Sequence, residues 1–101
     1  MKYSLLIITI LLVSLIDAVF AKSQKEMVIE SASQFQRWCK SLSYQHFRQK
    51  HQQPYNWAAS TIRQLNDYHT TGSWKVNNQQ RKVICQIRKG KKAKSTNIEI
   101  D

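Results

Sequence analysis

Acidic residues are scarce in this chain of 101 residues, which contains 6 Asp and Glu against 16 Lys and Arg. Asp67 is the only acid between Glu30 and Glu99. Hydrolysis by paired carboxylates requires two acids at the scissile bond, so this shortage argues strongly against such an enzyme. The sequence also lacks the G-x-S-x-G motif of a serine nucleophile. We therefore expect a protein that is not an enzyme.

The three histidines do not form a metal-ligand pattern. His46 and His51 are five positions apart, and His69 follows after another 18, so no pair has the i, i+4 spacing of ligands on one helix face. We expect neither a metal nor another cofactor. One alternative stays open, in which His46 and His69 supply the acid and base of a small secreted nuclease and Lys40 supplies the cation.

Residues 1–21, MKYSLLIITILLVSLIDAVFA, have the layout of a secretory signal peptide. Lys2 precedes the uncharged, largely apolar segment 5–16, and Val19 and Ala21 occupy the positions before a cleavage site at Lys22. The apolar segment is only 12 residues long, whereas a spanning helix needs about 20. We expect a single small domain over residues 22–101, either periplasmic or secreted, with no stable membrane anchor after cleavage.

Only two cysteines are present, Cys39 and Cys85, and both follow the predicted cleavage site. Export places them in an oxidising compartment, and one pair of cysteines permits a single intramolecular connectivity. The sequence therefore predicts a Cys39–Cys85 disulfide.

Apolar residues predict a helix near the N-terminus of this domain. Val28, Ala32, Phe35, Cys39 and Leu42 are spaced as on one helix face, which indicates a helix over 25–43 that extends at most to residue 50. Glu26 and Glu30 would then lie in its first turns, and Pro54 limits its end.

Residues 57–66 are ambiguous. Ala58, Ile62 and Leu65 fit a helix, whereas Trp57, Ala59 and Thr61 alternate as in a strand. The pattern slightly favours a helix.

The last third of the chain shows the period-2 alternation of β-strands. Three segments alternate, separated by a turn at residues 77–80 and another, containing Gly90, at 89–94. Their apolar residues are Trp74 and Val76, then Val83, Cys85 and Ile87, then Ile98 and Ile100. The sequence thus predicts an α+β fold, with an N-terminal helix packed on a small antiparallel β-meander and stapled by the Cys39–Cys85 disulfide.

The tryptophans are expected mainly in the core, with Trp38 and Trp74 the best candidates, because a small domain has few other large residues to pack. In a less favoured interpretation, Tyr55 and Trp57 form an exposed aromatic and basic patch with Arg48 and Lys50.

Positive charge is the strongest compositional signal, with a formal net charge of +10. Such a charge favours acidic or polyanionic partners. The basic turn after Cys85, together with the lysines on the strand faces opposite Cys85, predicts an anion- or partner-binding surface. Its members are Lys75, Lys82, Arg88, Lys89, Lys91, Lys92 and Lys94. The competing interpretation is a solvated turn whose lysines only discourage strand pairing.

We therefore expect a small, basic, exported binding protein that acts on an acidic protein or polyanion. An accessory protein of an envelope, secretion or conjugation system, or an immunity-type protein, would have this role. The outline formed by Trp57, Trp74, Val76 and Cys85 loosely resembles small disulfide-bonded exported domains of the colicin M immunity protein type, although no functional residue transfers from it. The alternatives are an effector or antimicrobial acting on an anionic membrane or nucleic acid, and the small nuclease. Oligomeric state and bacterial or eukaryotic source stay open.

Overall fold

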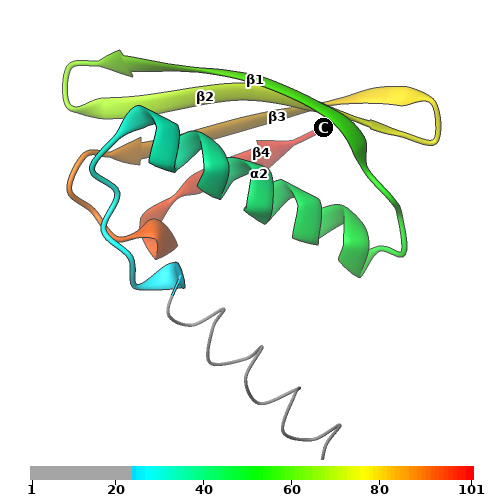
Figure 1. The fold of residues 1–101 in the computed structure, drawn as a ribbon, viewed down its shortest axis with the longest axis horizontal. Helices are drawn as coiled ribbons and strands as arrows, with labels where there is room; N and C mark the ends of the chain where they lie inside the picture. The colour runs from blue at the N-terminus through cyan, green and yellow to red at the C-terminus, as the bar shows by residue number, and fades with distance from the viewer. Residues whose placement is uncertain (1–23) are drawn as a thin grey trace, which may run out of the picture.

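The computed structural model describes residues 24–101, so the predicted signal peptide lies outside the described residues. One long helix, α2 (Ala32–Gln49), precedes a four-stranded sheet. The strands are β1 (Tyr55–Gln64), β2 (Asp67–Val76), β3 (Gln79–Arg88) and β4 (Asn97–Ile100), with a short 3-10 turn, η1 (Ala93–Ser95), before β4. Each strand pairs antiparallel with the next, and α2 lies across one face of the sheet (Figure 1). This confirms the predicted α+β architecture.

Helix α2 begins at Ala32, later than the predicted start at residue 25. Ser31 caps the helix, and its Oγ accepts a hydrogen bond from the Gln34 N–H at 3.2 Å. Residues 27–30 are not helical, because Val28 forms an antiparallel bridge with Lys92 and the Ile29 N–H donates to the Lys91 carbonyl at 2.9 Å. The predicted placement of Glu26 and Glu30 in the first turn is therefore wrong, and that turn contains no acid.

Residues 57–64 belong to strand β1, which corrects the slight preference for a helix. Trp57, Ala59 and Thr61 are partly buried on the side of α2, and the residues between them are exposed. The regular ladder between β1 and β2 runs from Ala58 to Gln64, and tertiary pairing of this kind overrides a weak local preference. The hairpin ends in a two-residue turn where Leu65 has φ 56° and is 90% exposed.

Both predicted turns are present, but the first covers only residues 77–78, because Gln79 and Gln80 already pair with β2 in strand β3. Asn77 and Asn78 have φ values of 52° and 63°, which asparagine tolerates better than most residues and which a two-residue turn between strands with a right-handed twist requires. Gly90 has φ 85°, as expected for the turn that follows β3.

The core lies between α2 and the sheet, and the disulfide crosses it. Cys39 and Cys85 are fully buried and bonded, with a Cα–Cα distance of 6.0 Å, which confirms the predicted pairing. Trp38 and Trp74 are buried, as predicted. Trp38 Nε1 donates to the Ala93 carbonyl at 3.2 Å, and Trp74 Nε1 donates to Ser43 Oγ at 2.8 Å. Both buried indole N–H groups thus have partners.

The opposite face of the sheet carries the alternate side chains of each strand, and no described helix covers it (Figure 1). We call it the outer face. Within residues 24–101, no helix combines the length and apolar character needed to cross a bilayer.

Candidate partner-binding surface

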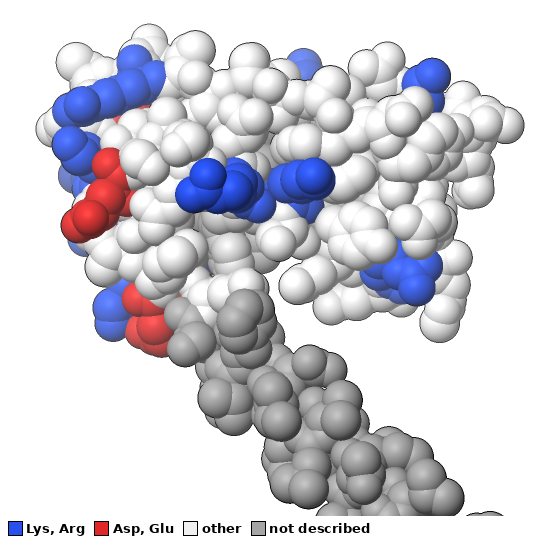
Figure 2. All heavy atoms as spheres, in the orientation of Figure 1, with Lys and Arg blue, Asp and Glu red and all other residues white. Residues whose placement is uncertain are grey.

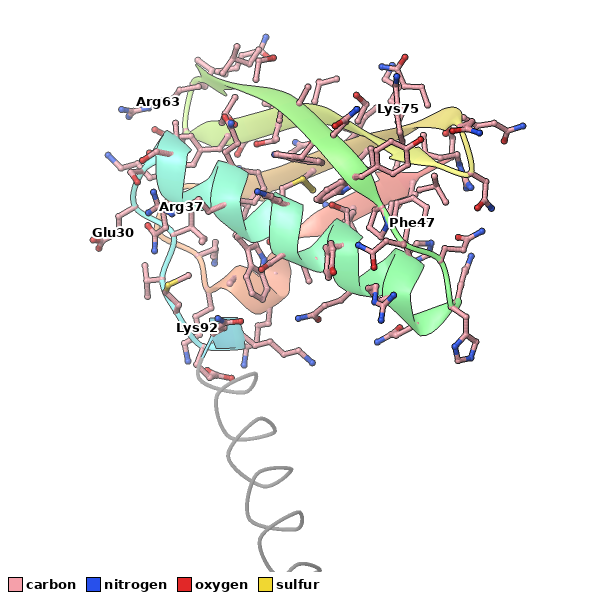
Figure 3. All side chains as sticks on the ribbon, turned by 45° about the vertical axis from the view of Figure 1, so that its right-hand side comes forward. Glu30, Arg37, Phe47, Arg63, Lys75 and Lys92 are labelled. Atoms are coloured by element: carbon pink, nitrogen blue, oxygen red, sulfur yellow. A yellow bond between two sulfur atoms is a disulfide. The ribbon has the colours of Figure 1, made fainter. Side chains whose placement is uncertain are left out.

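The seven basic residues predicted from the sequence fall into two separate groups. Lys75 and Lys82 lie on the outer face near the β2–β3 turn, and Figure 3 shows Lys75 projecting away from α2. Arg88 lies at the far end of β3. Lys82 and Arg88 are six residues apart, which is about 20 Å along a strand. The remaining four lysines are in the β3–β4 connection beyond Arg88.

Acidic residues neutralise part of this predicted set. Lys92 Nζ lies 2.9 Å from Glu26 Oε2, and Lys94 Nζ lies 3.2 Å from Glu26 Oε1. These hydrogen bonds and charges, Lys92 foremost, hold the pKa of Glu26 below its usual value. Arg88 Nε lies 3.8 Å from Asp67 Oδ1. Consequently the β3–β4 connection is less cationic than its sequence suggests.

The outer face also carries acids near its lysines. Asp101 Oδ1 accepts a hydrogen bond from the Lys82 backbone N–H at 3.1 Å, and Glu99 pairs with Ile84 across β3 and β4. Lys82 therefore shares its surroundings with carboxylates, and this part of the outer face has a mixed charge.

A second basic surface follows the exposed side of α2. Arg37, Lys40, Tyr44 and Arg48 are spaced by three, four and four residues, so they lie on one helix face. All four are exposed, and α2 contains no Asp or Glu. Figure 2 shows Lys and Arg side chains along the course of α2, with Asp and Glu confined to the side where α2 begins. We call these four residues the α2 stripe.

The α2 stripe borders an open groove of about 330 Å³ between α2 and β1. Ser33, Gln36, Arg37 and Lys40 line it from the helix, and Trp57 lines it from β1.

Gly72 explains how Trp57 is seated in this groove. A Cβ atom at Gly72 would lie 2.9 Å from both Cζ2 and Cζ3 of Trp57, which is closer than real Cβ contacts allow. The indole can lie over β2 only because position 72 has no side chain. There it packs against Trp74, with ring centroids 4.9 Å apart.

Sequence reasoning missed Arg37 and considered Lys40 only for a nuclease. The available signal was a helical face opposite the apolar stripe that has cations and no acid. The less favoured aromatic and basic patch is also arranged differently, because Trp57 shares a groove with Arg37 and Lys40. The Tyr55 hydroxyl instead donates to Asn78 Oδ1 at 3.0 Å.

The histidines proposed for a nuclease are not brought together. His46 is on α2, whereas His69 lies on the outer face, opposite Ile62 and Gln86. The sheet separates the two imidazoles, so they cannot act together on one phosphate. Among residues 24–101 no three His, Cys, Asp or Glu side chains gather as a metal site would require.

His46 should make the domain less stable at mildly acidic pH. Partial burial, and then the nearby charges of Lys50 and Arg81, lower its pKa below the usual 6.5. The unfolded chain therefore binds the proton more readily, so the free energy of unfolding falls as the pH drops through 6.5 toward the lower folded value. We expect urea denaturation at a series of pH values to show this decline, and His46→Gln to reduce it. His51→Gln, a change at an exposed histidine, should leave the decline intact; an unchanged slope in His46→Gln would contradict the prediction.

Protein-family models, curated proteins and solved structures yield no match to this chain.

Proposed function

We propose that this protein is a periplasmic or secreted binding protein that recognises an acidic segment of a partner protein through the α2 stripe. The observation that carries the proposal is an exposed helix face with three cations and no acid. The buried disulfide supports the location, because such bonds persist in oxidising, extracytoplasmic compartments. This role fits accessory proteins of envelope, secretion or conjugation systems and immunity-type proteins.

The cations of the α2 stripe are available for a partner. Arg37, Lys40 and Arg48 form no ion pair within residues 24–101, in contrast to Arg88, Lys92 and Lys94. Arg48 donates only to a neutral group, Gln53 Oε1, at 2.9 Å. An acidic ligand at the α2 stripe therefore displaces no internal carboxylate.

The length of the α2 stripe suits a segment with several acids. Arg37 and Arg48 are 11 residues apart, which corresponds to about 16 Å along a helix. That length exceeds the Debye length of about 8 Å at physiological salt, so separate carboxylates must approach separate cations. The net charge of +10 adds attraction at longer range and accelerates encounter.

Charge reversal should locate the binding surface. We expect Arg37→Glu/Lys40→Glu to weaken the binding of fluorescent poly-L-glutamate by about tenfold or more, measured by anisotropy at several salt concentrations. The matched control is Lys75→Glu/Lys82→Glu, which changes the net charge by the same amount on the outer face and should have a smaller effect.

Each other outcome contradicts part of this proposal. Equal losses in the two variants would mean that net charge, and not the α2 stripe, determines binding. A larger loss in the control would place the site on the outer face, where the sequence predicted it. Tighter binding to single-stranded DNA than to poly-L-glutamate at the same salt concentration would favour nucleic acid as the partner.

A further inference from the structure

We infer that the acidic partner segment binds in an extended conformation and adds a fifth strand to the free edge of β1. This inference rests on the proposed function and specifies the conformation of the ligand. Strand order β1-β2-β3-β4 leaves β1 with one neighbour among the described strands, so half of its backbone polar groups face outward.

From Ala58 onward, strand β1 lacks the usual protection of an edge strand. It is ten residues long, and Arg63 is its only charged residue. Pro54 precedes the strand, and the single irregularity lies between Tyr55 and Ala58, so the remainder is regular. The other edge strand, β4, has only four residues and includes Glu99. Long, regular edges with little charge readily pair with another strand.

The register of the β1–β2 hairpin identifies the groups that are free to pair. Gln64 and Asp67 flank a two-residue turn, so their N–H and C=O groups bond to each other across the hairpin. Because the direction of the backbone groups alternates along a strand, the N–H and C=O of every second residue then point toward the free edge. Those residues are Ala59, Thr61 and Arg63.

The α2 stripe lies on the side of the sheet where its cations can contact the side chains of such a strand. Thr61 Oγ1 donates to Gln36 Oε1 at 2.9 Å, which holds β1 against α2, and Arg37 and Lys40 line the groove above Trp57. A fifth strand would lie about 4.8 Å beyond β1 and present every second side chain toward α2. Glutamate at those alternate positions would meet Arg37 and Lys40.

Charge complementarity selects an acidic segment over a second copy of this chain. Pairing two β1 edges would bring together two Arg63 side chains and two molecules of net charge +10. An alternating acidic peptide satisfies the same backbone groups and neutralises the α2 stripe.

A peptide with glutamate at every second position, separated by threonine and valine, tests the inference by titration calorimetry. Two further versions carry N-methyl groups, one on all glutamates and the other on all intervening residues, so that each blocks one edge of the peptide. We expect the affinity of one methylated version to be lower than that of the parent peptide by about tenfold or more, and the other version to bind like the parent. In NMR titrations the amides of Ala59, Thr61 and Arg63 should shift most.

A protein variant provides an independent test. Ala59→Pro removes one outward N–H and leaves the β1–β2 ladder intact, so it should weaken binding of the parent peptide. Ala59→Val keeps that N–H and should leave the affinity for the peptide unchanged. The thermal midpoints of both variants verify that they fold. The test with methylated peptides uses the unaltered protein, so it does not depend on the folding of a variant.

The outcomes separate this inference from the proposed function. If both methylated peptides bind like the parent, recognition depends on charge alone, and only the fifth strand is wrong. Binding of poly-L-glutamate without binding of the parent peptide leads to the same conclusion. If neither ligand binds, both proposals fail. A dimer in sedimentation that Ala59→Pro dissociates would make a second copy the occupant of the edge and would overturn the inference.

Discussion

Replacing Cys39 and Cys85 together by alanine should lower the free energy of unfolding by about 4 kcal/mol. The bond closes a loop over a sequence separation of 46, and the loss of chain entropy in the unfolded state grows with that length. For a domain of this size, such a loss corresponds to a decrease of about 20 °C in the thermal midpoint. Circular dichroism melts of the protein and the double variant would measure it.

Chemical reduction provides the control for this prediction. The protein melted in a strong reductant should match the double alanine variant, because both lack the same cross-link. The variant itself should not respond to reductant. A double variant that melts within a few degrees of the oxidised protein would show that the disulfide contributes little to stability.

Truncating Phe47 to alanine should cost about 3–5 kcal/mol of unfolding free energy. Phe47 is fully buried in the last turns of α2, and the Arg81 guanidinium carbon lies 5.3 Å from the centre of its ring. Its removal leaves a cavity and also removes this cation–π contact. Urea denaturation would quantify the loss.

Gln49→Ala is the matched control, because Gln49 is exposed in the same part of α2. We expect this change to alter stability by less than about 0.5 kcal/mol. If Phe47→Ala were no more damaging than Gln49→Ala, the end of α2 would not be anchored as the structure indicates.

Long-range packing was predictable where two independent patterns met. Cys39 falls on the apolar face of a helix and Cys85 on the apolar face of a strand, so one disulfide defined how helix and sheet pack. The start of α2 was not predictable in the same way, because Val28 continues the apolar spacing of the helix. In the structure Val28 is not part of the helix, because it pairs with Lys92, far along the chain.

The candidate surface was harder to predict than the fold for a related reason. A run of lysines is evident in sequence, but its effective charge depends on acids that approach only in three dimensions. The single carboxylate of Glu26 binds both Lys92 and Lys94, across separations of 66 and 68 residues, and so offsets one of their two charges. Arg37 and Lys40 are less conspicuous in the sequence, and yet no carboxylate of residues 24–101 pairs with them. The assignment of β1 as a free edge strand required the strand order, which no local pattern contains.

The contact between residues 27–29 and the β3–β4 connection determines when the domain can be completed. Backbone hydrogen bonds join Ile29 to Lys91 and Gly90, and Ala93 to Met27. A segment near the end of the domain therefore holds its first residues in place. A polypeptide that crosses a membrane with its N-terminus first would leave Met27 and Ile29 without these hydrogen bonds until residues 90–93 have emerged. Local helix formation can precede that moment, whereas closure of the core must wait for almost the entire chain. For the exported protein that we propose, the native arrangement would therefore be assembled after translocation, in the compartment where the cysteines can be oxidised.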